Sequence, residues 1–576
     1  MKKIALLIAI MAASAALVTL FMLLHRKAQL EKLDNTFWSV SEKISSELSP
    51  ENKIRQMFVL YIELDKYDTL EKIMPGAIFV HNNNIPRFSN GEKDYEKLPF
   101  LIEKIHRIYM DKQVPPPLYS IDEEGGYVRR ISSKDDFPSA MTIGEAMVET
   151  GKNDLSMLAG FYTCLKLRKY GISWNFAPVA DVQSNPENPV IGARSFGSDP
   201  ELVYEATSSY LEGLTSARCL GSIKHFPGHG DTSLDSHKNL PYVNKNPEEL
   251  KNKELFPFKK VVQNNPELVH SIMTAHIVYP EVDDKPATFS YKWLTGKLKN
   301  EWEYKGIIVT DDLGMNAVNI YAAKNQIDNP AVEIINAGAD MLLYFGSAAE
   351  SEILVNKLIT FYETANPEFK NRIQESVKKI IYYKLKSGII DHYLDSTSRN
   401  WKPEEKQMVE VIKQYSYEIE NRIDTIEKQL PDAISTNKFI SEHGIKTIIA
   451  PETLPKNLQS EQLFTDLDEK KIDERLLKKF KNVLPLSRIS ESNCSNYCMV
   501  LITTKNKIES LPMLRSKTGK YIIYSLDNPF PSRKYKALLQ QEDIFITTFS
   551  NTDESVSALI NMVSSKYIPP KAAVLY

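Results

Sequence analysis

Short apolar runs alternate with longer amphipathic segments between about residues 45 and 395. This rhythm is typical of βα units, in which the strands of a parallel sheet alternate with helices. Eight strands over about 350 residues fit a (β/α)8 barrel with insertions better than an open sheet, so we predict an α/β fold with a TIM-like barrel over residues 45–395. The predicted strands are Met57–Ile62, Ala77–Val80, Leu118–Ile121, Trp174–Phe176, Ser222–Ile223, Ile272–Ala275, Ile307–Thr310 and Met341–Tyr344.

A second alternating series begins at about residue 436 and predicts a smaller C-terminal α/β sandwich domain over residues 436–576. Residues 396–435 are polar, charged and helical in pattern, and we interpret them as a helical linker between the two units. The predicted helices of the second unit are Glu469–Val483 and Ser555–Ser564. Its predicted strands are Lys446–Ala450, Tyr497–Thr503, Tyr521–Leu526, Asp543–Phe549 and Ala572–Leu575.

Residues 1–28 contain an apolar stretch, Ile4 to Leu24, that carries no charge over 21 residues and follows Lys2 and Lys3. About 20 apolar residues suffice to cross a bilayer as a helix, so we predict an N-terminal transmembrane anchor. The alternative is a cleaved signal peptide with Ala13-Ser14-Ala15 as the cut, which would make the protein secreted. Because the two lysines favour a cytoplasmic N-terminus, we expect a membrane-anchored protein with an extracytoplasmic body, in the periplasm or at the cell surface.

The overall composition is that of a core-forming protein, with 42% hydrophobic and 25% charged residues. The net charge of −3 at pH 7 gives no electrostatic reason to expect nucleic acid as a partner. Four cysteines are too few for a disulfide framework, and their spacing does not fit the paired pattern of zinc sites. None of these features indicates a protein partner.

Polar residues follow four of the predicted strands at the point where each strand ends. In a barrel of parallel strands the catalytic groups gather at the C-terminal strand ends, where the βα loops converge. We therefore expect these side chains to share one mouth. They are Asp122, Lys224, His225, His276, Asp311 and Asp312.

One loop is especially rich in reactive side chains and contains three of the ten histidines. It reads Lys224-His225-Phe226-Pro227-Gly228-His229-Gly230-Asp231-Thr232 and continues to Asp235-Ser236-His237. Asp235 and His237 are close enough for the carboxylate to orient the imidazole, and such a pair supplies a general acid/base near neutral pH. A metal site built on these histidines and Asp235 is the alternative, but Pro227-Gly228 breaks the helix that a His-x3-His pair needs. We therefore predict neither a metal ion nor another cofactor.

Asp311 and Asp312 directly follow the seventh predicted strand. Aspartate is a preferred helix N-cap, so we assign Asp312 to a position near the cap and Asp311 to the mouth. A third cluster joins Asp122 to two glycines and to Arg129 and Arg130. The glycines permit a sharp bend while the carboxylate projects, and the arginines face either the mouth or the solvent.

Five motifs of this chain resemble those of the bacterial β-N-acetylglucosaminidases of glycoside hydrolase family 3 and follow one another in the same order as in that family. The loop from Lys224 to His237 is the most specific of them. The resemblance covers residues 45–395 closely and the C-terminal part more loosely, and Tyr127 stands where family members usually have arginine. The other motifs are Asp122-Glu123-Glu124-Gly125-Gly126, Asn185-Pro186 with Arg194-Ser195-Phe196-Gly197, Thr310-Asp311-Asp312-Leu313-Gly314-Met315 and Ala337-Gly338-Ala339-Asp340.

The resemblance implies Asp311 as the nucleophile, His237 as the general acid/base and Asp235 as its partner. It also implies an exo-acting, retaining β-N-acetylglucosaminidase that acts by double displacement on peptidoglycan fragments (muropeptides) or chito-oligosaccharides. The hydroxyls and the acetamido group of the bound sugar would then be held by Asp122, Arg130, Arg194, Lys224 and His225.

Three alternatives to this activity stay open. One is a β-glucosidase-type enzyme of the same family. A second is phosphorolysis, because a neutral imidazole does not repel an anionic acceptor as a carboxylate would, so phosphate competes with water. The third is a tethered sugar-binding protein with an inactive barrel, against which the intact residues Asp311, Asp235 and His237 argue.

Overall fold

The computed structural model describes residues 28–133 and 136–444, the backbone of six strands between residues 446 and 547, and residues 555 and 558. Within these residues, no helix combines the length and the apolar character that crossing a membrane requires. The apolar stretch Ile4 to Leu24 lies outside the described residues, so the predicted anchor stays a prediction.

Eight parallel strands form one sheet in the order β10-β1-β2-β3-β4-β5-β6-β9. The two ends of the sheet meet, because Val309 of β9 bridges to Met341 and the Thr310 N–H donates to the Met341 carbonyl oxygen at 3.0 Å. The predicted barrel is therefore confirmed, and each predicted strand overlaps an observed one. The strands are β1 (Phe58–Leu60), β2 (Ala77–Val80), β3 (Leu118–Ile121), β4 (Trp174–Asn175), β5 (Leu220–Phe226), β6 (Ser271–Thr274), β9 (Ile307–Thr310) and β10 (Leu342–Tyr344).

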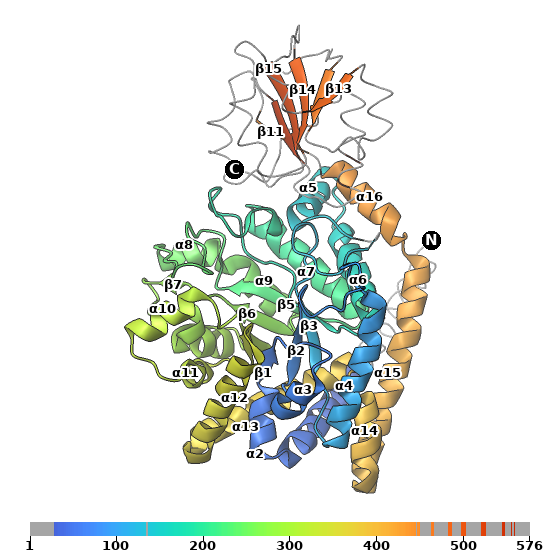
Figure 1. The fold of residues 1–576 in the computed structure, drawn as a ribbon, viewed down its shortest axis with the longest axis vertical. Helices are drawn as coiled ribbons and strands as arrows, with labels where there is room; N and C mark the ends of the chain where they lie inside the picture. Colours follow the sequence, from blue (N-terminus) through green and yellow to red (C-terminus); the bar gives the residue numbers. More distant parts are fainter. Residues whose placement is uncertain are drawn as a thin grey trace, which may run out of the picture.

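Helices connect these strands and wrap the outside of the barrel (Figure 1). They cover the strands on that side while side chains fill the interior, which is why the strands appear in the sequence as continuous apolar runs. The helices are α2 (Pro50–Gln56), α3 (Tyr67–Ile73), α4 (Leu98–Asp111), α5 (Ala140–Thr150), α6 (Asp154–Lys169), α7 (Pro200–Ser216), α8 (Pro247–Asn252), α9 (Leu255–Asn264), α10 (Asn316–Lys324), α11 (Pro330–Ala337) and α12 (Ala348–Thr364), with a π-helical segment at Lys292–Glu301. A short antiparallel pair, β7 (Val278–Tyr279) and β8 (Asp283–Pro286), was not predicted.

Helix α13 (Pro367–Ser387) crosses the N-terminal ends of the strands and forms the floor of the barrel. Lys379 Nζ donates to the carbonyl oxygen of Gly306, just before β9, and Lys384 Nζ donates to that of Pro116, just before β3. Residues 28–47 are helical and run antiparallel to α13, with Asp34 beside Tyr382 and Ser45 beside Gln374. The floor is thus closed by two helical layers.

Residues 396–435, the predicted linker, are largely helical in the structure and include the end of α14 (Asp391–Thr397), all of α15 (Pro403–Gln429) and the start of α16 (Ala433–His443). It packs on the barrel, because Glu420 of α15 accepts hydrogen bonds from Arg168 and Arg218. Asn437 of α16 donates to the carbonyl oxygen of Asp136 at 2.6 Å.

The C-terminal part contains a six-stranded sheet in the order β11-β16-β15-β14-β12-β13. The pairs are parallel except for β11 and β16, which are antiparallel. Four predicted strands overlap β11, β14, β15 and β16, whereas β12 and β13 were not predicted. The prediction of a helix up to Val483 was wrong at its end, where β13 begins, and Ala572–Leu575 lies outside the described residues. The strands are β11 (Lys446–Ile449), β12 (Gln462–Thr465), β13 (Asn482–Pro485), β14 (Tyr497–Ile502), β15 (Lys520–Ser525) and β16 (Ile544–Thr547).

A disulfide bond joins Cys164 of α6 to Cys219, the residue before β5, with Cα atoms 5.8 Å apart. The cysteine count did not suggest this bond. The two residues are 55 positions apart and meet only because α6 packs beside the start of β5.

Candidate active site

A cavity of about 190 Å³ lies at the C-terminal ends of the barrel strands. Seven of the eight site residues predicted from the sequence line it, and the eighth, Asp235, contacts one of them. The seven residues come from four different strands and share one mouth, whereas two of the strand-end residues expected there, His276 and Asp312, do not line the cavity. The lining residues are Asp122, Glu124, Val128, Arg130, Val190, Arg194, Lys224, His225, His229, Ser236, His237, Met273, Asp311 and Leu343.

The predicted pair of Asp235 and His237 is formed. The ring Nδ1 of His237 lies 2.9 Å from Asp235 Oδ1, and the His237 backbone N–H donates to the same oxygen at 2.9 Å. Burial raises the pKa of Asp235, but these hydrogen bonds outweigh that effect and lower it, so the carboxylate is ionised. The imidazole side chain is 65% exposed, and His237 lines the cavity.

Asp311 follows β9, where its N–H donates to the Thr274 carbonyl oxygen at 3.2 Å. Its Oδ1 accepts the N–H of Asp312 at 2.8 Å. Burial raises the pKa of Asp311, but nearby His225 and His276, the hydrogen bond from the Asp312 N–H and, least, His237 together outweigh burial and lower it. An ionised carboxylate in a cavity is the form that acts as a nucleophile.

A network of buried charges forms the wall of the cavity on the β3–β5 side. Lys224 Nζ lies 2.7 Å from Asp122 Oδ1 and 2.6 Å from Glu124 Oε1, and Arg194 binds Glu124 through two hydrogen bonds of 2.8 Å. Burial alone would lower the pKa of Lys224, but the two carboxylates raise it, so the lysine stays charged. Arg130 Nη2 lies 3.7 Å from Asp122 Oδ2. This wall offers charged donors and acceptors to the hydroxyls of a polar ligand.

Asp181 was not predicted, although it holds two histidines of the reactive loop. It is fully buried, its Oδ2 lies 2.7 Å from His225 Nδ1, and its Oδ1 accepts the backbone N–H of His229 at 2.7 Å. The sequence contains only a weak signal for this role, a single acid in the apolar run Ala180-Asp181-Val182. Glu124 was also not predicted to line the cavity, because the sequence places it only within the motif Asp122–Gly126.

Glycines allow the reactive loop to lie close to its neighbours. A Cβ atom at Gly230 would come within 1.6 Å of the Val182 carbonyl oxygen. At the third strand, Gly125 and Gly126 have φ angles of 92° and 54°, in the left-handed region that favours glycine.

Two predictions near the mouth need correction. His276 does not line the cavity, because it is buried with Nε2 3.0 Å from the Asp312 carbonyl oxygen and Nδ1 2.8 Å from Thr288 Oγ1. Asp312 does not cap a helix, since Met315 holds that position at α10. Its Oδ1 instead accepts the N–H groups of Gly314 and Phe345.

Arg129 and Arg130, left undecided by the sequence, have different surroundings. Arg130 lines the cavity, whereas Arg129 Nε lies 3.6 Å from Asp136 Oδ2, away from the lining residues. Among residues 28–444, in so far as they are described, no group of three or more His, Cys, Asp or Glu side chains is placed to hold a metal ion.

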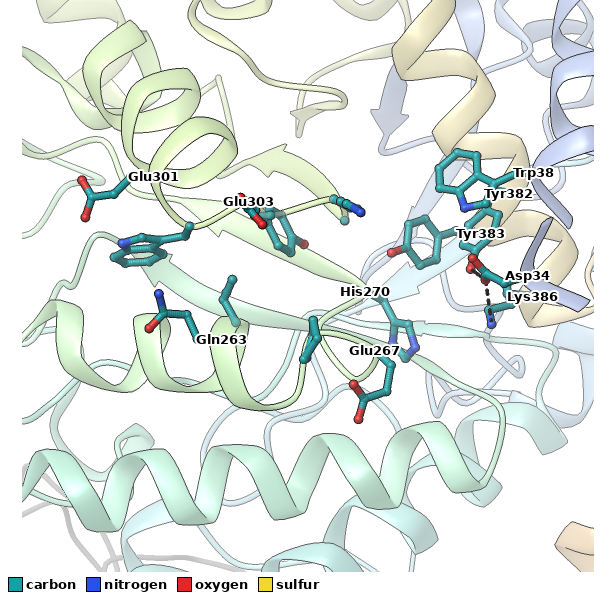
Figure 2. Close-up of a pocket in the computed structure, with 16 residues that line it drawn as sticks. Asp34, Trp38, Gln263, Glu267, His270, Glu301, Glu303, Tyr382, Tyr383 and Lys386 are labelled. Atoms are coloured by element: carbon teal, nitrogen blue, oxygen red, sulfur yellow. Dashed lines mark hydrogen bonds and ion pairs between the residues drawn. The ribbon is translucent and has the colours of Figure 1, made fainter. Parts of the chain in front are cut away.

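A larger hollow of about 640 Å³ lies at the opposite end of the barrel, beside the residues that precede β6 and β9 (Figure 2). Two of its charged residues contribute to the packing of the floor, because Asp34 accepts a hydrogen bond from the Tyr382 hydroxyl and pairs with Lys386 at 3.8 Å. His270 accepts the N–H of Gly221, and burial lowers its pKa to about 3. A neutral histidine at the N-terminal strand ends lacks the features of a barrel active site.

Comparisons with known proteins identify the family of the chain. The family model described as "Glycosyl hydrolase family 3 N terminal domain" matches residues 50–382. Beta-hexosaminidase A of Pseudoalteromonas piscicida is 37% identical over 242 residues, which are 40% of this chain and 40% of that protein. The matched region thus spans less than half of that relative. Beta-hexosaminidase of Tolumonas auensis is 35% identical over 274 residues, 47% of this chain and 78% of that protein.

A solved structure supports the fold over a longer stretch. The glycoside hydrolase family 3 beta-N-acetylglucosaminidase from Paenibacillus sp. str. FPU-7 aligns with a TM-score of 0.70 and 24% identity, over 92% of this chain and 100% of that one. At this identity the likeness concerns the fold alone. Because the matched family model covers more than half of the chain and includes every residue that lines the cavity, the chain belongs to glycosyl hydrolase family 3.

Proposed function

We propose that this enzyme is an exo-acting, retaining β-N-acetylglucosaminidase. The observation that carries the proposal is that an ionised carboxylate, Asp311, and an imidazole oriented by a carboxylate, His237, line the same small cavity. These are the two groups that a double displacement at a glycosidic bond requires. A cavity of about 190 Å³ suits the terminal sugar of a glycan, which agrees with exo action.

In the first step, Asp311 attacks the anomeric carbon while the bond from that carbon to the leaving oxygen breaks. His237 donates its Nε2 proton to the departing oxygen, and Asp235 stabilises the imidazolium before the transfer. In the second step, neutral His237 takes a proton from water, which attacks the glycosyl-enzyme and releases the sugar with retained configuration.

The charged wall holds the sugar in place for this chemistry. Lys224 and Arg194 are buried beside carboxylates that keep them charged and oriented, so they donate to sugar oxygens without reorganisation. His225 has its Nδ1 fixed by Asp181, which leaves Nε2 toward Arg194 at 3.4 Å. Asp122 and Arg130 complete the set that binds hydroxyls and the acetamido group.

The proposed substrates are peptidoglycan fragments or chito-oligosaccharides outside the cytoplasm. Relatives named beta-hexosaminidase support the sugar, and the apolar segment Ile4 to Leu24 supports an anchor. The Cys164–Cys219 disulfide supports an extracytoplasmic body independently, because disulfides persist in oxidising compartments and are rare in the cytosol.

Activity of the purified full-length protein tests the proposal. We expect release of the aryl group from an aryl β-N-acetylglucosaminide and at least tenfold lower kcat/KM on the aryl β-glucoside. Preference for the glucoside would establish the β-glucosidase alternative. Absence of activity on both substrates, with N-acetylglucosamine still bound, would indicate a sugar-binding protein.

Phosphorolysis is tested in the same assay, since the acid/base is an imidazole and not a carboxylate. The products are analysed for sugar 1-phosphate in the presence of physiological phosphate. We expect free N-acetylglucosamine as the main product. If sugar 1-phosphate dominates instead, the reaction is phosphorolysis and not hydrolysis.

A further inference from the structure

A buried ion pair that the proposed mechanism does not use lies beside the reactive loop. Glu254, the residue before α9, is fully buried, and its Oε1 accepts hydrogen bonds of 2.6 Å from Lys245 Nζ and from Ser184 Oγ. Lys245 Nζ also lies 3.2 Å from Asp231 Oδ1. We call Asp231, Lys245 and Glu254 the clamp. None of these three residues lines the cavity.

The clamp joins the two ends of the segment that carries the acid/base pair. Asp231 directly precedes residues 232–244 and Lys245 directly follows them, while Asp235 and His237 lie between. Residues 232–244 form neither a helix nor a strand, so no regular backbone pattern holds them in place. Joining the two ends of a loop reduces the number of conformations that the loop can adopt.

The acid/base pair does not fix its own position relative to the cavity. Asp235 and His237 bind each other across two residues, so their hydrogen bonds set the shape of the pair alone. Between them, Ser236 Oγ lies 3.0 Å from Nε2 of His229, which is buried in the reactive loop. The placement of the exposed imidazole therefore depends on this contact and on the ends of the segment.

Glu254 is a rigid base for this clamp. A Cβ atom at Gly228 of the reactive loop would come within 2.8 Å of the Glu254 Cβ atom, and the Gly228 carbonyl oxygen accepts the Tyr279 hydroxyl proton. Burial lowers the pKa of Lys245, but Glu254 and Asp231 outweigh burial and raise it, so the lysine stays charged. A charged lysine between two carboxylates binds both, and loss of one partner of a buried pair is costly.

We propose that the clamp positions His237 for proton transfer to the leaving oxygen, which makes Asp231, Lys245 and Glu254 positioning residues of the proposed reaction. Lys245 holds Asp231 and the far end of the segment on buried Glu254, and this sets the span that residues 232–244 bridge. A displacement of a reacting group by about 1 Å costs up to about 10²-fold in rate. This inference rests on the proposed function.

The dependence on the leaving group tests the clamp in the full-length protein. Lys245→Met keeps an unbranched apolar side chain and removes the charge. The measured quantity is kcat/KM, because it reports the steps up to formation of the glycosyl-enzyme. On chitobiose, whose leaving group needs a proton, we expect a fall of about 10-fold to 100-fold. On an aryl β-N-acetylglucosaminide with a good leaving group, we expect a change of less than about threefold.

A double-mutant cycle shows whether the clamp acts through the imidazole. The same change is made in the His237→Ala protein, where the clamp has no acid/base left to position. We expect Lys245→Met to lower kcat/KM on chitobiose by less than about twofold in that background. A merely structural effect would lower kcat/KM by the same factor with and without His237.

A second variant and a matched control complete the test. Asp231→Ala releases the segment but keeps the buried pair of Lys245 and Glu254, so it decides the question even where Lys245→Met does not fold. We expect the same substrate dependence, with a loss of about fivefold on chitobiose. Lys251→Met removes an exposed lysine of α8 that pairs with Glu248 at 3.4 Å, and we expect no change on either substrate.

The outcomes separate the clamp from the proposed function. Equal losses on both substrates, or equal losses with and without His237, would assign the clamp to stability alone and overturn its positioning role. Unchanged kcat/KM on chitobiose in the folded variants would also overturn that role, while the proposed function stands. If His237→Ala itself loses the same factor on both substrates, the acid/base assignment of the proposed function is overturned, and the clamp with it.

Discussion

Both ends of the barrel bury charged side chains, but these side chains serve a different purpose at each end. At the floor, Asp340 is fully buried and each of its carboxylate oxygens accepts two hydrogen bonds. Its Oδ1 accepts from Arg372 at 2.7 Å and from Ser376 at 2.9 Å, and its Oδ2 accepts from Lys379 at 2.8 Å and from the Ile308 N–H at 2.9 Å.

At the mouth, the carboxylates and cations are paired with one another and still line a cavity. Asp311 receives a hydrogen bond from its own neighbour, and Lys224 and Arg194 share Glu124 while lining the same space. Burial and ion pairing are therefore common to both ends. The difference lies in whether the charged groups also face a space that a ligand can enter, and this distinguishes a site from a structural network.

The largest expected effect is the loss of the nucleophile at the mouth. Asp311→Asn keeps an oxygen that accepts the Asp312 N–H but removes the charge that attacks the anomeric carbon in the proposed mechanism. We expect kcat on the aryl β-N-acetylglucosaminide to fall by about 10³-fold or more, with the midpoint of thermal unfolding unchanged or raised. Undiminished turnover would contradict the nucleophile assignment.

A smaller loss is expected at the acid/base. His237→Ala removes the proposed proton donor, and we expect kcat to fall by about 10²–10⁴-fold on chitobiose, whose leaving group needs a proton. The loss should be clearly smaller on an aryl substrate with a good leaving group. Asp235→Asn should give the same substrate dependence with a smaller loss, because the imidazole stays in place. Equal losses on both substrates would contradict a role in protonating the leaving group.

A substitution at the floor should change the stability of the protein and not its turnover. Asp340→Asn leaves Arg372 and Lys379 beside a neutral group, and we expect the free energy of unfolding in urea at pH 7 to fall by about 3 kcal/mol. We expect kcat/KM of the folded variant to stay within twofold. A large loss of activity without a loss of stability would remove the distinction between floor and mouth.

The contribution of Asp340 also has a defined pH dependence. Burial raises its pKa, but Lys299, Lys379 and Arg372 outweigh burial and hold it well below the ordinary value. The folded state therefore releases the proton more readily than the unfolded state, whose pKa is about 3.9. The stabilisation is fully present above that value and is lost progressively as the pH falls toward the much lower pKa of the folded state, so the stability difference between wild type and Asp340→Asn should shrink as the pH falls below about 4.

The smallest expected effect concerns Lys299, the third cation of the floor. Burial, acting against the attraction of Asp340, lowers its pKa to about 7. Because the unfolded state binds the proton up to about pH 10.5, the stability of the wild type should rise between about pH 7 and pH 10. Lys299→Met should stabilise the protein by an amount on the order of 1 kcal/mol below pH 7, and its advantage should shrink across that window. An advantage that is constant with pH would contradict the lowered pKa.

Much of the barrel and the mouth was predictable from the sequence. Strands of a barrel are buried on both faces, so segments such as Ile307–Thr310 stand out as apolar runs, and polar residues directly after them are expected at the mouth. Asp235 and His237 are two residues apart, so their pairing is a local property. The predictions failed where the position of a residue after a strand does not fix the direction of its side chain. His276 follows β6 but turns toward Thr288 and the Asp312 backbone.

Other features had no local signal at all. Asp181 acquires its role only when β4 and β5 become neighbours and bring His225 beside it. The rings of Tyr61 and Phe345, more than 280 positions apart, meet only when β10 pairs with β1. The Cys164–Cys219 bond likewise depends on the contact between α6 and the start of β5.

The sequence by itself determined the alternation of the eight barrel strands with helices, the pairing of Asp235 with His237 and the residue types available at each strand end, because these follow from short-range periodicity and spacing. The tertiary structure decided which of those residues face the cavity, which are saturated by hydrogen bonds, and which aromatic rings meet. Such properties depend on closure of the barrel, which brings β9 against β10 and fixes the surroundings of each side chain, and no short stretch of chain encodes that closure.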